Sequence, residues 1–152
     1  CASTLGTYFL SQGRAVGLIS TSNDNRFLNP ERGDRQTGKF QEELAYIKSD
    51  GQTSLFEALL GRQQNIIKGN TVIVITCAQS DNVLNTIQFI SQLGAIPMLV
   101  MIDSKTFLGR PDLLKENVLN GGSVFPVANI AYMDDARRAL EKGFTPWFNS
   151  QN

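Results

Sequence analysis

The sequence predicts an α/β fold: an open, mostly parallel sheet with helices on both faces. A continuous apolar, β-branched run occurs at 71–76, and a second apolar run occurs at 97–102, as expected for strands that are covered on both sides. Segments with apolar residues at helical spacing separate the predicted strands. Each connection is also long enough for the crossover that parallel strands need.

The chain has 152 residues, of which 41% are hydrophobic, and this suits one domain with a sizeable core. We therefore expect a single domain over 1–152. The chain begins with Cys1, directly in a helical pattern. We interpret it as an excised piece of a longer protein.

The first third of the chain predicts a helix, a strand and a loop. Residues 2–13 place apolar side chains at helical spacing and end in a glycine stop signal. Residues 14–20 then predict a strand. The segment 21–35 is rich in turn formers and charge, so it predicts a loop, with a short strand near 26–28.

Two helices follow. Phe40, Leu44 and Ile47 mark one face of a helix that ends at 49–51. A third helix is expected over 54–68.

Strands and helices alternate through the rest of the chain up to Ile102. The run 71–76 predicts a buried strand, and apolar positions between 83 and 90 mark the next helix, which Gly94 closes. The run 97–102 predicts a second buried strand.

The last third predicts two helices around one strand. Residues 111–119 predict a short helix, with a proline at its start. The segment 123–128 predicts a strand at an edge of the sheet, because Pro126 cannot donate to a ladder. Apolar positions between 133 and 140 predict a final helix that Gly143 closes.

Composition excludes several classes of function. The chain has no histidine, which removes histidine-dependent triads and zinc hydrolase sites. No strand is followed by a phosphate-binding glycine motif, so no dinucleotide or other cofactor is expected. Fourteen basic residues balance fourteen acidic ones, which gives no broad attraction to nucleic acid. No segment is apolar over the roughly 20 residues of a membrane span.

Ligands of open parallel sheets bind beyond the carboxyl ends of the strands. These ends bring 20–21, 76–81, 103–104 and 128–129 to one edge of the predicted sheet. Any site should use some of these residues.

Three of the strand-end residues have both a chemical and a structural interpretation. Asp81 and Asp103 are carboxylates that suit acid–base catalysis, but Asp81 also suits a helix N-cap and Asp103 a brace for the following loop. Cys77 lies where nucleophiles occur, but no histidine is present to activate it. A small, half-buried residue is the alternative for Cys77. Cys1 and Cys77 are far apart, so we expect no structural disulfide and a reducing compartment.

The stretch "GQTSLFEAL" (51–59) resembles the second metal loop of von Willebrand factor A-like domains, where Gly-Gly-Thr-x-Leu opens a helix. "GNTVIVIT" resembles the strand that follows that loop. Together with "ASTLGTYFLSQGRAVGLIS", "NPERGDRQTGKFQEELAYIKSDGQTSLFEALL" and "LVMIDSKTF", these segments resemble the C-terminal half of the family catalogued as domain of unknown function 58. That family carries a von Willebrand factor A-like domain and is often associated with MoxR-type AAA+ ATPases. The resemblance covers the chain to about residue 140.

The resemblance implies a Rossmann-like sheet that lacks its first central strand, which would lie between 14–20 and 71–76. Either these two strands then pair directly or a second copy of the chain fills the gap. The family fold also implies a metal-ion-dependent adhesion site. Thr53 matches its second-loop threonine, whereas the first-loop Asp-x-Ser-x-Ser motif is absent and Cys77 replaces the third-loop aspartate. A thiol is a poor magnesium ligand. We therefore expect an incomplete site without metal, in which Thr53 is a helix cap and loop former.

These observations favour a non-enzymatic protein-interaction domain that works with a MoxR-type AAA+ ATPase at the cytoplasmic face. Any membrane anchor is expected in segments outside this chain. The alternative is a flavodoxin-like small-molecule binder or enzyme that uses Asp81, Asp103 and Cys77. A deep pocket with convergent carboxylates would favour the enzyme, and a shallow polar face would favour docking. The residues expected to contact the partner lie on the strand-end face: Thr53, Ser54, Gln79, Asp81, Asp103 and Ser104.

Overall fold

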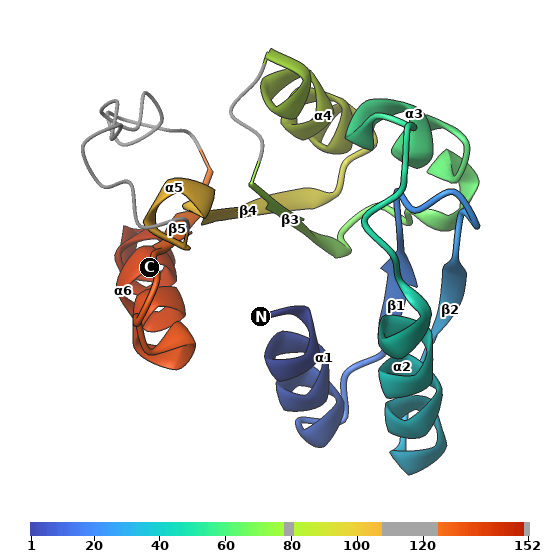
Figure 1. Cartoon of the computed structure of the whole chain (residues 1–152), viewed down its shortest axis with the longest axis horizontal. Helices are drawn as coiled ribbons and strands as arrows, with labels where there is room; N and C mark the ends of the chain where they lie inside the picture. The colour runs from blue at the N-terminus through green and yellow to red at the C-terminus, as the bar shows by residue number, and fades with distance from the viewer. Residues whose placement is uncertain (78–80, 108–124, 151–152) are drawn as a thin grey trace. The chain divides into compact units, whose positions relative to one another are not determined.

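A computed structural model describes residues 1–77, 81–107 and 125–150. The chain divides into two compact units, unit 1 (Cys1–Ile66) and unit 2 (Ile67–Asn152), and each has its own small sheet (Figure 1). A single domain over 1–152 stays a prediction. No helix in the described part of the chain is both long enough and apolar enough to cross a membrane.

Unit 1 is built on an antiparallel hairpin. β1 and β2 pair through Leu18 with Leu28 and through Ile19 with Phe27. The expectation that 14–20 forms a parallel strand is therefore wrong. The elements of unit 1 are α1 (Ala2–Ser11), β1 (Val16–Ile19), β2 (Phe27–Glu31), α2 (Asp34–Tyr46), α3 (Leu55–Leu60) and a 3-10 turn, η1 (Gln63–Asn65).

The turn between β1 and β2 explains the hairpin. Asn25 has a positive φ of 44°, a conformation that asparagine tolerates better than most residues. Its N–H donates to the Ser22 carbonyl at 2.8 Å, and the Ser20 N–H donates to the Arg26 carbonyl at 2.9 Å. The turn formers predicted in 21–35 are thus real, but the segment also contains β2 and the start of α2.

α2 is joined to the hairpin by a buried polar side chain. Gln36 is fully buried, and its Nε2 donates to the Val16 carbonyl at 2.7 Å and to the Asn29 carbonyl at 2.8 Å. Between α1 and α2, the Phe40 ring packs where Gly6 has no side chain; a Cβ at Gly6 would lie 2.2 Å from the ring. Unit 1 therefore combines one aromatic contact with a polar tie between the helix and both strands.

The helix expected over 54–68 is interrupted. α3 ends at Leu60, and Gly61 precedes the short η1 turn. Glycine is about 1 kcal/mol less favourable than alanine within a helix, which weakens continuation at this point. The Arg62 N–H donates to the Leu59 carbonyl at 3.0 Å, so the chain tightens into 3-10 geometry.

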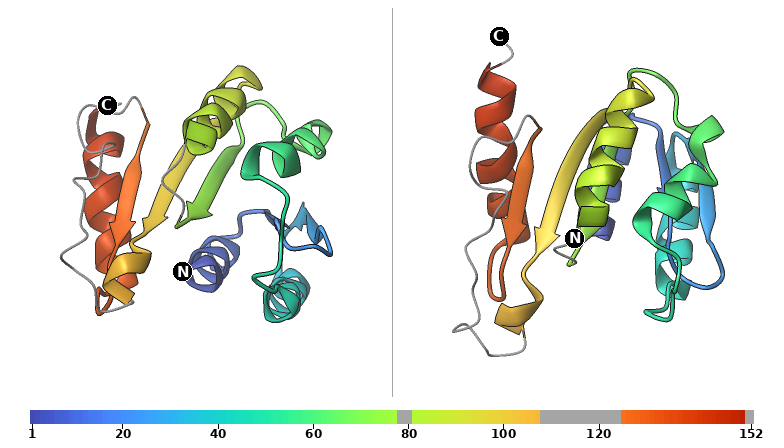
Figure 2. Two further views of the ribbon diagram at one scale, coloured as in Figure 1. Left: turned by 45° about the horizontal axis from the view of Figure 1, so that its top comes forward. Right: turned by 90° about the horizontal axis from the view of Figure 1, so that it is seen from above.

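Unit 2 holds a parallel three-stranded sheet in the order β3-β4-β5 (Figure 2). Helix α4 lies on one side of this sheet and α6 on the other (Figure 1). The predicted α/β class and the parallel strands at 71–76 and 97–102 are confirmed. The elements of unit 2 are β3 (Thr71–Thr76), α4 (Asp81–Gln92), β4 (Ile96–Ile102), α5 (Ser104–Phe107), β5 (Val127–Ile130) and α6 (Ala136–Ser150).

β5 lies at an edge, as Pro126 predicts, but it begins later than expected. Pro126 has no N–H to donate, yet its carbonyl accepts from the Leu99 N–H at 3.0 Å. The strand itself starts at Val127. The helix expected over 111–119 and residues 123–124 lie outside the described residues.

β4 is the central strand and the most deeply buried. Leu99 and Val100 have no exposed surface. Pro97 is tolerated here because the missing N–H would face β5, whose first pair with β4 joins Val127 to Leu99.

The final helix differs from its prediction at both ends. α6 begins at Ala136, so Met133 precedes it, and the helix continues through Gly143. Gly143 serves close packing: a Cβ there would lie 2.6 Å from the Ala128 Cα of β5. By contrast, Gly94 ends the α4 region with φ +76°, as expected of a stop signal.

Candidate functional site

The carboxyl ends of β3 and β4 border one shallow hollow in unit 2. Its volume is about 170 Å³. Because parallel strands end at the same edge, the fold brings Cys77 from the end of β3 beside Asp103 and Ser104 from the end of β4. The lining residues are Cys77, Ile102, Asp103, Ser104 and Lys105.

Asp103 braces the short helix α5. Its Oδ1 accepts from the Lys105 N–H at 3.1 Å. Its carbonyl accepts from the N–H of Thr106 at 3.1 Å and from the Thr106 hydroxyl at 2.7 Å. The Asp103 N–H donates to the Ile130 carbonyl at 2.9 Å, which fixes the turn to β5. The structural interpretation of Asp103 is thus confirmed.

The other predicted strand-end residues differ from Asp103 in exposure and position. Ser104 and Cys77 are exposed, and Cys77 is a free thiol. Asp81 begins α4, and Gln79 lies outside the described residues. In the described part of the chain, no group of three or more cysteine and carboxylate side chains could hold a metal ion.

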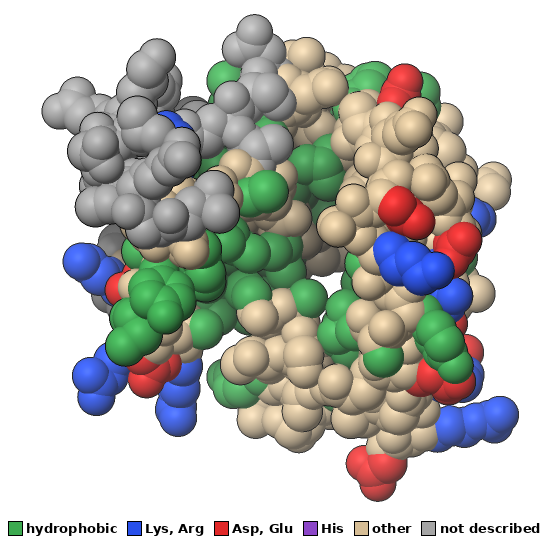
Figure 3. All heavy atoms as spheres, viewed as in Figure 1, with side chains coloured by type: hydrophobic (Ala, Val, Ile, Leu, Met, Phe, Trp, Pro, Cys, Tyr) green, Lys and Arg blue, Asp and Glu red, His purple; other side chains and the backbone are tan. Residues whose placement is uncertain are grey.

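An apolar cluster beside this hollow was not predicted from the sequence. Phe107 and Tyr132 are 51% and 57% exposed, and their rings meet edge to face with centroids 5.5 Å apart. The Tyr132 N–H donates to the Thr106 hydroxyl at 2.8 Å, which joins the turn after β5 to α5. Hydrophobic side chains gather over α5 and β5 in Figure 3. The signal in the sequence was an aromatic residue just beyond each of two strand ends.

Met133 follows Tyr132 in a constrained turn. It is 85% exposed and has φ +68°, which is unusual for a long side chain. The Asp134 carboxylate accepts from the Ala131 N–H at 2.8 Å, and the Asp134 N–H donates to the Ala131 carbonyl at 3.2 Å. The turn therefore holds an apolar side chain in water.

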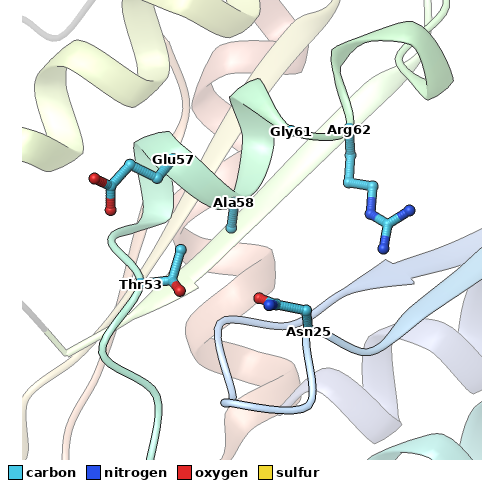
Figure 4. A pocket seen from close by; sticks show the side chains of 6 residues that line it. All are labelled: Asn25, Thr53, Glu57, Ala58, Gly61 and Arg62. Atoms are coloured by element: carbon cyan, nitrogen blue, oxygen red, sulfur yellow. The ribbon is translucent and has the colours of Figure 1, made fainter.

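Unit 1 contains a second hollow, of about 280 Å³, around Thr53. Figure 4 shows Thr53 and Asn25 on one side of it, with Arg62 opposite and the Glu57 carboxylate directed away. The Arg62 guanidinium lies over the Phe27 ring, 4.8 Å from its centroid. The lining residues are Asn25, Thr53, Glu57, Ala58, Gly61 and Arg62.

The helix cap in this loop is Ser54, so the expectation that Thr53 is the cap is wrong. The Glu57 N–H donates to the Ser54 Oγ at 3.2 Å, and the Ser54 N–H donates to the Glu57 carboxylate at 3.0 Å. This is a capping box, which requires serine and glutamate three residues apart. The hydrogen bonds from the Ser54 backbone and then its hydroxyl lower the pKa of Glu57 below its ordinary value of 4.5.

The Thr53 loop packs against the end of β1. A Cβ at Gly51 would lie 1.7 Å from the Thr21 carbonyl, so only glycine allows this approach. Next to it, the buried Ser20 hydroxyl donates to the Ser22 Oγ at 2.9 Å. Among the described residues, the Thr53 hydroxyl makes no hydrogen bond within the protein.

The five predicted contact residues that the structure describes fall in both units. Thr53 and Ser54 belong to unit 1, whereas Asp81, Asp103 and Ser104 belong to unit 2. A single face formed by all of them stays a prediction. Comparison of the chain with protein-family models, with curated proteins and with solved structures gave no match.

Proposed function

We propose that the chain is a non-enzymatic protein-interaction domain that docks its partner through a surface at the carboxyl ends of the unit 2 strands. The exposed aromatic pair beside the strand-end hollow is the observation that carries this proposal. Exposed apolar side chains that gather together mark interaction sites more often than scattered ones do. Aromatic residues and methionine are also enriched at protein interfaces. The strand-end surface comprises Cys77, Ser104, Lys105, Phe107, Tyr132 and Met133.

The hollow itself supports docking over catalysis. Its volume of about 170 Å³ lies below the roughly 300 Å³ at which small-molecule pockets begin. One carboxylate, Asp103, lines it, and this carboxylate already accepts the Lys105 N–H. The chain has no histidine to act as a base at neutral pH.

The partner we propose is a MoxR-type AAA+ ATPase, at the cytoplasmic face. This choice rests on the resemblance of 2–20, 29–60, 70–76 and 99–107 to the von Willebrand factor A-like domain of the domain of unknown function 58 family. Thr53 and Ser104 are the predicted contacts whose side chains make no hydrogen bond in the described structure. They remain available to a partner in a way that Ser54 and Asp103 do not.

The test is binding of the intact chain to a purified MoxR-type ATPase, measured by biolayer interferometry. Tyr132→Ala should weaken binding by roughly 10- to 100-fold, the loss typical of an aromatic hot spot. Tyr8→Ala is a matched control because Tyr8 is 58% exposed and also meets a phenylalanine, Phe9, edge to face. Equal losses in the two variants would contradict docking through the strand-end surface. No binding by the unmodified chain would remove the proposed partner.

One observation favours the alternative function, because Cys77 and Asp103 line the same hollow. The alternative is a small-molecule binder or enzyme that uses Cys77, Asp103 and Asp81, and an enzyme with Cys77 as its nucleophile needs an activated thiolate. Alkylation of the protein by iodoacetamide at neutral pH tests this, with Cys77→Ser identifying the reacting thiol. Reaction of Cys77 at the rate of free cysteine supports docking, and much faster reaction supports the enzyme.

A further inference from the structure

The outer edge of β3 carries backbone groups that the sheet does not use. The Ile96 N–H donates to the Asn70 carbonyl at 2.8 Å, and the ladder pairs Thr71 with Ile96. In a parallel ladder, alternate residues direct both backbone groups to the same neighbour. Asn70, Val72 and Val74 therefore face β4, and the intervening residues face away from it.

Three residues form this outer edge: Thr71, Ile73 and Ile75. Within the described part of unit 2, β3 pairs with β4 alone, and no hydrogen bond from another element reaches the outer N–H and C=O groups of these residues. Such a row of unpaired groups is complementary to another β-strand. The chemistry of the edge thus specifies an extended backbone as its occupant.

β3 lacks the features that protect edge strands. The opposite edge, β5, has four residues and follows Pro126, and both short length and proline discourage further pairing. β3 has six residues, no charge, no proline and no bulge in its register with β4. Uncharged β-branched segments of this length pair readily with other strands.

Burial also distinguishes β3 from its neighbour. Both strands are apolar runs, which is typical of strands covered on both faces. Five consecutive residues of β4 are buried, whereas Val74 is the buried residue of β3 and its neighbours on both faces are half-buried. The face around β3 is thus incompletely covered in comparison with β4.

We propose that β3 pairs in antiparallel orientation with β3 of a second copy of this chain, about a two-fold axis at Ile73. In this register Ile73 lies opposite Ile73 of the second copy, and Thr71 lies opposite its Ile75. The three outward residues are symmetric about Ile73, so the pairing satisfies every one of their N–H and C=O groups. The two sheets then continue as one.

A second copy fits this edge for two reasons. A two-fold axis at Ile73 pairs β3 with the same strand in antiparallel orientation, so a charge close to the axis would lie near its own copy. β3 has none, and the whole chain has a formal net charge of zero, which removes the repulsion that keeps copies apart. This interface runs along β3 and is independent of docking at the strand-end surface.

The first test is the mass of the unmodified chain by sedimentation velocity at rising concentration. We expect a shift from the monomer mass to twice that mass. A monomer at every concentration overturns the proposal.

The second test locates the interface by disulfide formation in a Cys1→Ser, Cys77→Ser background. Ile73→Cys places two thiols across the axis at a Cα separation of about 5.5 Å, within the range of a disulfide. Ile75→Cys is the matched control: it lies on the same edge, but its two copies are four residues apart along the ladder, about 13 Å. Circular dichroism under reducing conditions checks that both variants keep the fold.

We expect air oxidation to yield a covalent dimer with Ile73→Cys, while Ile75→Cys remains at the background level. Equal cross-linking of both variants, or a dimer of the unmodified chain without cross-linking at Ile73→Cys, overturns the assigned interface.

Discussion

Different interactions stabilise the interior of unit 1 and the interior of unit 2. Among the described residues, unit 1 buries three hydrophobic side chains, Leu10, Phe40 and Leu59. Unit 2 buries a larger set, which lies on β4, on α4 at one side of the sheet and on α6 at the other. Unit 1 instead buries the polar side chains of Ser20, Ser22 and Gln36. On the face shown in Figure 3, acidic and basic side chains also intersperse over unit 1.

This difference explains where sequence patterns succeed. Apolar burial is periodic, since helices and strands repeat their buried positions at fixed intervals. Hydrogen bonds from buried side chains to the backbone are not periodic, because one side chain such as Gln36 can donate to two carbonyls that are distant in sequence. A unit stabilised by such ties gives a weak pattern in the sequence.

The largest expected effect is a cavity in unit 2. Leu99→Ala removes a fully buried side chain from the central strand and should lower the free energy of unfolding by about 2–5 kcal/mol. Ile96→Ala, at the exposed start of the same strand, is the control and should cost less. Urea denaturation measures the total, and hydrogen exchange followed by mass spectrometry assigns the loss to unit 2. A small effect at Leu99 would contradict an apolar basis for this unit.

The next effect tests the polar tie in unit 1. Gln36→Leu keeps a side chain of similar size but leaves the Val16 and Asn29 carbonyls without their donor. Each buried group left unsatisfied costs about 1–3 kcal/mol. The exposed Gln41, which bonds Ser3 and Thr7, is the control, and Gln41→Ala should change stability by about 0.5 kcal/mol. A more stable Gln36→Leu protein would show that unit 1 also favours apolar packing, because the substitution removes the buried Gln36 Oε1, which has no hydrogen-bond partner.

Two helical glycines, one in each unit, test how closely their helices pack against neighbouring elements. Gly143→Ala should destabilise unit 2 by about 1–3 kcal/mol, because the new Cβ would meet the Ala128 backbone at 2.6 Å. In α2 of unit 1, a Cβ at Gly38 meets nothing within 4 Å, so Gly38→Ala should stabilise by about 0.4–1 kcal/mol. Thermal unfolding of the two variants gives both signs. The same sign at both positions would contradict the close packing of α6 on β5.

The fold of unit 2 was predictable in most respects. The runs 71–76 and 97–102 are apolar, continuous and bounded by turn signals. Pro126 cannot donate to a ladder, so it indicates an edge strand. Gly143 was misread as a helix end because a glycine can stop a helix or admit a close neighbour, and the sequence does not distinguish the two. Met133 has helical spacing, but the Asp134 turn removes it from the helix.

Unit 1 was less predictable for the same physical reason. The turn formers in 21–35 predict a reversal, but the register of the hairpin depends on Asn25 and on the Ser20 to Arg26 hydrogen bond. The candidate site was partly predictable, because strand ends placed Cys77, Asp103 and Ser104 together. Phe107 and Tyr132 are 25 residues apart in the sequence, so their contact depends on the β4–β5 pairing and could not be read locally.

The smallest expected effect concerns the capping box of α3 in unit 1. Hydrogen bonds from Ser54 lower the pKa of Glu57 in the folded protein below 4.5. A lowered folded-state pKa stabilises the fold above the unfolded-state pKa, and this contribution is lost as pH falls through the folded-state value. Amide exchange in α3, compared between the unmodified chain and Glu57→Gln, should therefore differ at pH 6 and converge at acid pH.

Glu42→Gln is the control for this measurement, because Glu42 is exposed and makes no hydrogen bond or ion pair in the described residues. It should leave the exchange of α3 unchanged at both pH values. Since the Glu57 carboxylate is exposed, solvent screens its interaction and the difference at pH 6 should stay small. Equal protection of α3 in the Glu57→Gln protein at pH 6 would show that Ser54 alone caps the helix. A difference that persists at acid pH would mean that the glutamine change acts through packing instead of charge.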